Sequence, residues 1–251
     1  MSEGKGADIL DVSIELFNKE EVLSLCQTWL YSSELHQIVT VNPEFLMESR
    51  RNHEFFNVLQ KAQLRIADGF GLVLISRILY GKQGRLFRMT GVDLVYLLSD
   101  LCAQNGKSVY LMGGDPEVAG RAARALQKKY PSLIISGAEE GLPKQGGGSD
   151  DGLCQRIFAA QTDVLFVALG APRQDLWIAR NKEKLHGVSI AVGVGGTFDY
   201  LAGTVPYAPR IVRSLGLEWL FRLITQPHRL NRIFTAVIRF PIAVLFWRLK
   251  K

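Results

Sequence analysis

The sequence predicts an α/β fold in which helices cover both faces of a mostly parallel sheet, with a basic amphipathic helical appendage at the C-terminus. Continuous runs of Val, Ile and Leu alternate with segments of helical spacing, the pattern of βαβ units whose strands are buried on both faces. The 251 residues suffice for one well-packed domain and an appendage. We expect the domain to cover residues 1–205 and the appendage residues 206–251.

Six apolar runs predict the strands of the sheet, at residues 37–42, 64–68, 108–114, 133–141, 163–170 and 189–196. Apolar residues at helical spacing predict the helices between them, at 43–62, 69–81, 90–106, 116–130, 151–161 and 172–187. Thr90 is placed to cap its helix, and Asn105 and Gly106 to end it. The Gly-rich stretch 143–152 predicts a surface loop rather than a domain boundary.

Basic charge is concentrated near the C-terminus. Residues 210–251 hold nine of the 30 Lys and Arg residues but one of the 24 acidic residues, so this segment carries about +8 and the rest about −2. Trp, Phe and Leu interleaved with Arg are typical of a helix lying in a membrane interface. A helix docked on the body or on a partner chain is the alternative, whereas nucleic acid would favour a more polar scaffold. The apolar run 233–247 is interrupted by Arg239 and Pro241, and we expect it to be too short to span a bilayer.

Cysteine usage and the N-terminus indicate a cytosolic location. Cys26, Cys102 and Cys154 are widely spaced and odd in number, which suits a reducing compartment and predicts neither disulfides nor a zinc site. The first ten residues lack the cationic-then-apolar order of a secretory signal. We therefore expect no metal in the site, and a protein that works at the cytoplasmic face of a membrane.

Polar residues follow the first two predicted strands. Ligands of parallel sheets bind beyond the carboxyl ends of the strands, which makes these positions candidates for a site. Thr40 and Asn42 fit hydrogen bonds to sugar hydroxyls, or simple turn chemistry before Pro43. Asp68 follows a short strand, where a carboxylate in a partly desolvated cleft can act as a general base; an ordinary Asp-Gly turn is the alternative.

Glycines and polar residues also follow three later strands. Gly113 and Gly114 begin a strand-to-helix turn whose backbone N–H groups favour an anion, although a tight turn alone also explains them. Gln174 lies in the first turn of the next helix, and Gly195 and Asp199 follow the last strand, as ligand contacts or as packing and capping residues. Neither the GxGxxG fingerprint nor a P-loop is present, which counts against NAD and ATP chemistry. We expect no cofactor.

Seven segments, taken in order, carry a family resemblance. VTVNPEF, ADGFGLV, FRMTGVDL, LMGGDP, ALGAPRQD, VGVGGTFDYLAG and YAPRIVRSLGLEWLFRL together resemble the WecG/TagA/CpsF family of bacterial glycosyltransferases, over about Ile9 to Arg232. The resemblance implies an inverting, metal-independent enzyme with a Rossmann-like core. It also implies transfer of N-acetylmannosamine, its uronic acid or glucose from a UDP donor to a sugar on undecaprenyl diphosphate. The products would be wall teichoic acid, common antigen or exopolysaccharide.

The same resemblance implies roles for single residues. Asp68 would be the catalytic base, Thr40 and Asn42 would line the sugar site, and Arg88 and Gln174 would help to bind substrates. The Gly113–Gly114 turn and the Gly195–Asp199 segment would flank the UDP site. The family often has Gln-Glu where this chain has Gln174 and Asp175, and no family motif that we identify covers the tail beyond Arg232.

These features lead to a hypothesis with open alternatives. The appendage would seat the enzyme on an anionic membrane surface, with Arg210 and Arg213 reaching the lipid diphosphate. A non-catalytic nucleotide-binding module recruited to the membrane, or an NAD-dependent oxidoreductase, is the competing interpretation. The sequence identifies neither the donor and acceptor sugars nor the pathway, and leaves open whether the chain forms a homo-oligomer. We expect no binding of nucleic acid.

Overall fold

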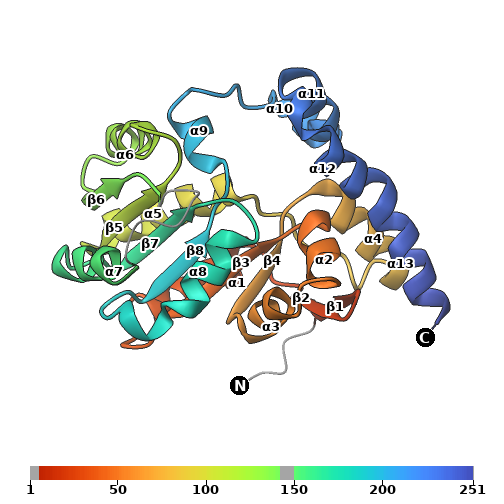
Figure 1. Ribbon diagram of the computed structural model, residues 1–251, viewed down its shortest axis with the longest axis horizontal. Helices are drawn as coiled ribbons and strands as arrows, with labels where there is room; N and C mark the ends of the chain where they lie inside the picture. The colour runs from red at the N-terminus through yellow and green to blue at the C-terminus, as the bar shows by residue number, and fades with distance from the viewer. Residues whose placement is uncertain (1–5, 142–149, 251) are drawn as a thin grey trace.

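A six-stranded parallel sheet forms the centre of the protein, seen in a computed structural model that describes residues 6–141 and 150–250 (Figure 1). The strand order is β4-β3-β8-β7-β5-β6, and every ladder between neighbours is parallel. The strands are β3 (His36–Val41), β4 (Leu64–Ala67), β5 (Ser108–Gly113), β6 (Ile134–Glu139), β7 (Val164–Ala168) and β8 (Ile190–Gly193). All six predicted strands are confirmed. The sequence analysis had not assigned the small antiparallel hairpin of β1 (Gly6–Ile9) and β2 (Val12–Glu15).

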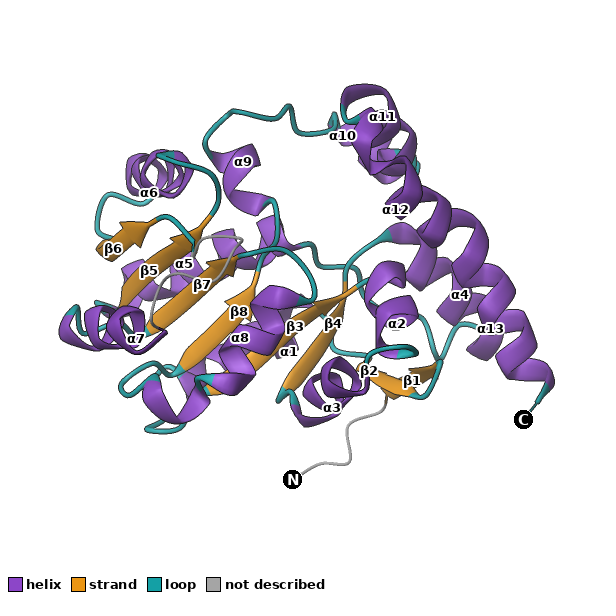
Figure 2. Cartoon of the chain, viewed as in Figure 1, coloured by secondary structure: helices purple, strands orange, loops and turns teal. Residues whose placement is uncertain are grey.

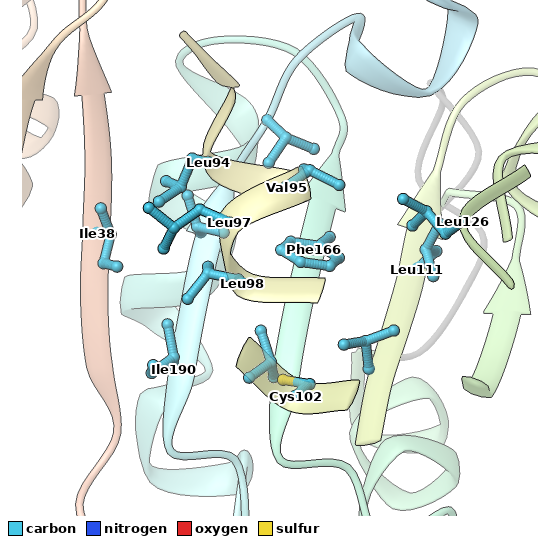
Figure 3. Close-up of a cluster of buried hydrophobic side chains, with 14 of the residues drawn as sticks. Ile38, Leu94, Val95, Leu97, Leu98, Cys102, Leu111, Leu126, Phe166 and Ile190 are labelled. Atoms are coloured by element: carbon cyan, nitrogen blue, oxygen red, sulfur yellow. The ribbon is translucent and has the colours of Figure 1, made fainter. Parts of the chain in front are cut away.

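Helices cover both faces of this sheet, as predicted (Figure 2). One face is packed against α1 (Lys19–Trp29), α5 (Gly91–Asn105) and α6 (Val118–Lys129). The other is packed against α2 (Pro43–Ser49), α3 (His53–Lys61), α7 (Asp150–Ala159) and α8 (Arg173–Arg180). In the core beneath α5, Leu94, Leu98 and Cys102 lie against Phe166 and Ile190 of the central strands (Figure 3). This burial on both sides explains why the strands are apolar without interruption.

Three boundaries differ from the prediction. The helix expected at 43–62 is two helices, because the Asn52 side chain accepts a hydrogen bond from Phe55 N (3.0 Å) and begins α3 as a new helix. The helix expected at 172–187 ends at Arg180, followed by the short η1 (Lys182–Lys184). Asp150, expected in the Gly-rich loop, begins α7 and accepts a hydrogen bond from Trp177 Nε1 (3.0 Å). Residues 142–149 of that expected loop lie outside the described residues.

The remaining helices lie at the end of the sheet near β4 and above its carboxyl edge (Figure 1). They are α4 (Phe70–Tyr80), α9 (Thr197–Leu201), α10 (Arg210–Ser214), α11 (Glu218–Thr225), η2 (Pro227–Arg229), α12 (Leu230–Phe234), η3 (Thr235–Arg239) and α13 (Phe240–Leu249). The last three are continuous, and Phe240 and Val244 enter the same buried cluster as residues of α2 and α4.

The C-terminal helix is longer than the sequence analysis expected. It runs over 20 residues, Leu230–Leu249, and an 18-residue window of it has a mean hydropathy of 1.4, so by length and composition alone it is long and apolar enough to cross a membrane. The expectation that this segment is too short to span was therefore wrong. Arg239 and Pro241 interrupt the apolar run without ending the helix, and the turn directly before Pro241, η3, is wound as a π-helix.

Candidate active site

A cavity of about 290 Å³ opens at the carboxyl edge of the sheet. Residues at or just after the ends of all six strands line it, and the start of α5, α9, α11 and the segment after α11 supply further parts of its wall. Parallel strands all end at one edge, so the side chains that follow them are brought together although they are far apart in the sequence. Seven of the predicted site residues line the cavity: Thr40, Asn42, Asp68, Gly114, Gln174, Gly195 and Asp199.

The end of β3 contributes Thr40 and Asn42. The Thr40 hydroxyl donates to the carbonyl of Gly193 on the neighbouring strand (3.3 Å). Asn42 is the N-cap of α2, because its Oδ1 accepts from the backbone N–H groups of Glu44 (2.9 Å) and Phe45 (3.1 Å). The turn chemistry considered for Asn42 is therefore present, and the residue lines the cavity as well.

Asp68 follows β4 directly and is partly buried at the cavity wall. Burial raises the pKa of its carboxyl to about 6, from an ordinary value of 3.8. The positive charges of Arg222 and Arg88 act in the opposite direction and favour the carboxylate. The negative charges of Glu218 and Asp93 add to the increase. A carboxyl that titrates near 6 is a carboxylate at neutral pH and retains enough basicity to take a proton.

Gln174 connects the start of α8 to the end of β8. Its side chain is buried, and its Oε1 accepts a hydrogen bond from the backbone N–H of Gly195 (2.9 Å). A Cβ on Gly193 would lie 2.4 Å from Gln174 Nε2 and 2.7 Å from Asp175 Oδ1, so glycine is required there for these side chains to fit. The pair of side chains is thus packed directly beneath the strand-end loop that lines the cavity.

In the Gly113–Gly114 turn, Gly113 is required by backbone packing and Gly114 lines the cavity. Gly113 has φ +121°, and a Cβ there would lie 2.6 Å from the backbone of Ala168, so the close approach of β7 requires glycine. Gly114 lines the cavity together with Asp115. Asp115 does not cap α6, because the helix begins at Val118 with Glu117 at its N-cap position.

Asp199 lies in the first turn of α9, whose N-cap position is Gly196, so it does not cap this helix. Asp199 is one of the residues that line the cavity. Burial raises its pKa, and the charge of Asp115 adds to this effect. Thr204 Oγ1 donates to its carbonyl oxygen (2.9 Å) and holds the following turn. Two carboxyls therefore share one part of the cavity, where they can accept hydrogen bonds from hydroxyl groups.

Three arginines from the C-terminal segment form one wall of the cavity, Arg222, Arg229 and Arg232, and Arg173 at the start of α8 is a fourth arginine that lines it. The Arg222 guanidinium lies 5.9 Å from the ring centre of Tyr200. Arg232 Nε donates to Glu44 Oε2 of α2 (2.5 Å), which ties this wall to the body. Burial lowers the pKa of Arg229, and the nearby positive charge of Arg232 lowers it further. The three positive charges make this wall suitable for an anion.

Of the predicted arginines, Arg88 and Arg213 do not line the cavity. Arg88 is paired with Glu218 and donates from Nη1 to the Arg213 carbonyl (3.5 Å). Arg213 donates from Nε to the Ala208 carbonyl (3.1 Å) and stacks on a tyrosine ring, 4.5 Å from its centre. The Arg210 side chain lies outside the described residues. Arg88 therefore holds the C-terminal helices to the body, with Glu218 as the acidic partner, whereas the Arg213 side chain holds the turn before α10.

Arg222, Arg229 and Arg232 were not among the predicted site residues. Their spacing of seven and three residues would place them on one face of a continuous helix, but they lie on three elements, α11, η2 and α12, separated by the break at Gln226 and Pro227. The sequence alone does not give the direction of this turn. The three side chains reach the cavity because the helix that follows packs on α2 and α4.

In the described part of the chain, no group of three or more His, Cys, Asp or Glu side chains is arranged to hold a metal ion. The cavity instead combines a partly buried carboxyl, two further carboxyls and four guanidinium groups, those of Arg173, Arg222, Arg229 and Arg232. Such a set can bind a polar ligand that carries an anionic group, and can take a proton from it.

Comparison with known families adds one finding. Residues 7–251 match the family described as "Glycosyl transferase WecG/TagA/CpsF family". The match includes the tail beyond Arg232, for which the sequence analysis had found no family motif.

Proposed function

Because the chain belongs to the WecG/TagA/CpsF glycosyltransferase family, we propose that it transfers a sugar from a UDP donor to a sugar carried on undecaprenyl diphosphate. The family acts in the synthesis of cell-surface polysaccharides and uses a sugar donor and a lipid-linked acceptor. N-acetylmannosamine or its uronic acid is the first expected sugar, and glucose the second. The observation that carries the proposal is the placement of Asp68 and the three arginines around one cavity.

The reaction proceeds by direct displacement. Asp68 takes the proton of the acceptor hydroxyl as its oxygen forms a bond to the anomeric carbon. On the opposite side of that carbon, the bond to the diphosphate oxygen breaks and UDP leaves with the electron pair. Attack opposite the leaving group inverts the anomeric configuration. A pKa of about 6 keeps Asp68 ionised at neutral pH, as a general base requires.

Arg222, Arg229 and Arg232 stabilise the charge that develops on the departing diphosphate. Guanidinium groups suit this task because they stay protonated and match phosphate oxygens with paired N–H donors. Fixed positive charges near a leaving group act mainly in the transition state. In this arrangement, the arginines supply the positive charge that a metal ion supplies in other transferases.

The carboxyls and amides of the remaining wall orient the sugar and the nucleotide. Thr40 and Asn42 line the cavity near Asp68 at neighbouring strand ends, which supports a role for them in binding the sugar hydroxyls. Gly114, Gly195 and Asp199 line it at the other strand ends, which supports a role for them in binding UDP. The C-terminal segment 206–251 acts as an appendage that attaches the enzyme to the cytoplasmic face of an anionic membrane, where its lipid-linked acceptor resides.

UDP release tests this function. The protein is incubated with a panel of UDP-sugars, with and without a lipid diphosphate carrying N-acetylglucosamine or glucose, without added metal. We expect one donor to give UDP only in the presence of acceptor. Release that does not depend on the acceptor would contradict a transferase. If folded protein binds a UDP-sugar but releases no UDP with any donor and acceptor, the result would favour the non-catalytic binding module.

A further inference from the structure

The body contains a second basic and apolar segment, apart from the C-terminal one. Residues 69–92 include Arg77, Lys82, Arg85 and Arg88 and no Asp or Glu. Arg88 is paired with Glu218, whereas the other three are exposed. The segment begins directly after Asp68 and contains the whole of α4.

One face of α4 is apolar and exposed. Phe70, Leu74 and Ile78 are spaced four residues apart, so they lie on one side of the helix, with 41%, 46% and 68% of their surfaces exposed. Leu72, on the other side, is fully buried in the core. Monomeric surfaces rarely carry such rows of large apolar side chains unless something binds to them.

The C-terminal helix lies beside α4. Residues of both helices enter one buried cluster, so their exposed sides face away from a shared core. Both also end on the β1–β2 hairpin, where the Tyr80 hydroxyl donates to the Asp8 carbonyl and Trp247 Nε1 donates to Asp11 Oδ1 (2.9 Å). At the start of α4, a Cβ on Gly216 would lie 2.5 Å from the Phe70 ring, which places the α10–α11 turn against it.

The exposed side of the C-terminal helix has the same character as that of α4. Its large apolar residues with more than a third of their surface exposed are Leu230, Phe234, Val237, Ile238, Ile242, Leu245, Phe246 and Leu249. Arg239, Arg248 and Lys250 on the same segment are exposed and basic. Two helices from distant parts of the sequence, packed on one core cluster and both contacting the β1–β2 hairpin, therefore expose apolar side chains with basic residues along them.

We propose that α4 and the helix Leu230–Leu249 together form a single docking surface for an anionic phospholipid bilayer, so that the body itself, and not only the C-terminal segment, contacts lipid. The mixture of Phe, Leu and Ile with Lys and Arg matches the acyl boundary and the negative headgroups of such a bilayer. A second copy of the chain fits less well, because a symmetric contact would bring basic residues of the two surfaces together.

Docking of α4 also sets the distance of Asp68 from the bilayer; its meaning for catalysis rests on the proposed function. Asp68 is separated from α4 by one residue, so docking of α4 on the bilayer holds the base close to the headgroup layer. The sugar of a lipid-linked acceptor is carried just outside that layer. The acceptor then reaches Asp68 without leaving the membrane.

Vesicle binding of the full chain tests the proposal without donor or acceptor, so its result is independent of the proposed function. Partitioning onto phosphatidylglycerol and phosphatidylcholine vesicles is measured by sedimentation. Each Lys or Arg near an anionic surface contributes about fivefold, so the triple variant R77Q/K82Q/R85Q should lower the phosphatidylglycerol partition coefficient on the order of 100-fold. The matched control R121Q/R124Q/K128Q removes three exposed charges from α6, at the far end of the sheet (Figure 1), and should change it little.

The apolar side chains are tested in the same assay. Leu74→Gln with Ile78→Gln removes two half-exposed apolar residues, and should lower partitioning on the order of 10-fold or more. Ile134→Gln with Phe158→Gln is the control, since these residues are 48% and 58% exposed on other elements. Near-native partitioning of both α4 variants, with wild-type thermal unfolding, would overturn the proposal.

A fluorescent label distinguishes contact with lipid from other causes of weaker binding. Cys26, Cys102 and Cys154 are buried, so a cysteine at position 78 (Ile78→Cys) is labelled selectively in the folded protein. We expect brominated phosphatidylglycerol to quench this label, but not one placed by Phe158→Cys. An unquenched label at position 78 on vesicle-bound protein would refute the proposal. So would a label that becomes shielded on self-association without lipid, which would assign the surface to a second copy.

Discussion

Asp175 gives a quantitative test of the buried polar layer beneath the site. Its side chain is fully buried, and its carboxyl oxygens make no well-formed hydrogen bond in the described structure; the Gln174 side chain and its own backbone N–H oppose the effect of burial on its pKa only in part. Burial raises its pKa from 3.8 to about 7. The folded state therefore holds a neutral carboxylic acid in a range of pH where the unfolded chain carries a carboxylate.

The sign and size of the effect follow from linkage. Between pH 3.8 and about 7 the folded protein binds one more proton than the unfolded chain, so stability falls as pH rises through this range. Each unit of pKa difference corresponds to about 1.36 kcal/mol, which gives about 4 kcal/mol in total. About 3 kcal/mol of this falls between pH 5 and pH 8. Asp175→Asn removes the titration and keeps the shape.

The assay is denaturant unfolding of the wild type and Asp175→Asn at pH 5 and pH 8. The stability difference between the two proteins should shift by about 3 kcal/mol in favour of the variant at the higher pH. Asp151→Asn is the matched control, because its exposed ion pair with Lys184 is worth at most about 1 kcal/mol. A stability difference that is the same at both pH values would show that Asp175 is ionised in the folded protein, and would refute the reasoning.

Three further predictions concern the site. The kcat/KM for transfer should fall about tenfold per pH unit below about pH 6, because protonation of Asp68 removes the base; a profile that is flat from pH 5 to pH 8 would exclude it. Arg229→Gln should lower kcat on the order of 100-fold. Arg229→Lys should lower kcat less, because lysine keeps the positive charge and loses only the paired N–H donors. An equal loss of kcat in both variants, measured at saturating donor, would contradict a role for the charge. The third prediction is a double-mutant cycle of Arg88→Gln and Glu218→Gln. Each single change should cost about 3 kcal/mol of stability, because it leaves a partly buried charge unpaired, and the double change should cost less than the sum of the two. Additive losses would show that the pair does not couple.

The sheet could be predicted from the sequence because its strands are buried on both faces. Such strands are continuous apolar runs, and turn residues bound them clearly. The β1–β2 hairpin was missed because its alternation covers only four residues in each strand. The break of the expected helix at Asn52 depends on one side chain accepting a backbone hydrogen bond, which helical spacing does not reveal.

The strand-end half of the site could also be predicted. The rule that ligands bind beyond the carboxyl ends of parallel strands selected Thr40, Asp68 and Gln174, and all three line the cavity. The arginine half could not, because Arg222 and Arg229 are brought to the cavity by packing of the C-terminal helix on the body. The roles of all these residues, and the division at residues 205 and 206, remain predictions.

The most direct test of the central claim is a single-turnover transfer assay on Asp68→Asn, with UDP-sugar binding measured separately by calorimetry. Asp100→Asn, which removes an exposed carboxylate from α5, serves as the control. We predict that the Asp68 variant binds donor as the wild type does and transfers its sugar at least about 100-fold more slowly. Transfer at the wild-type rate would show that Asp68 is not the base, and would contradict the mechanism proposed for this site.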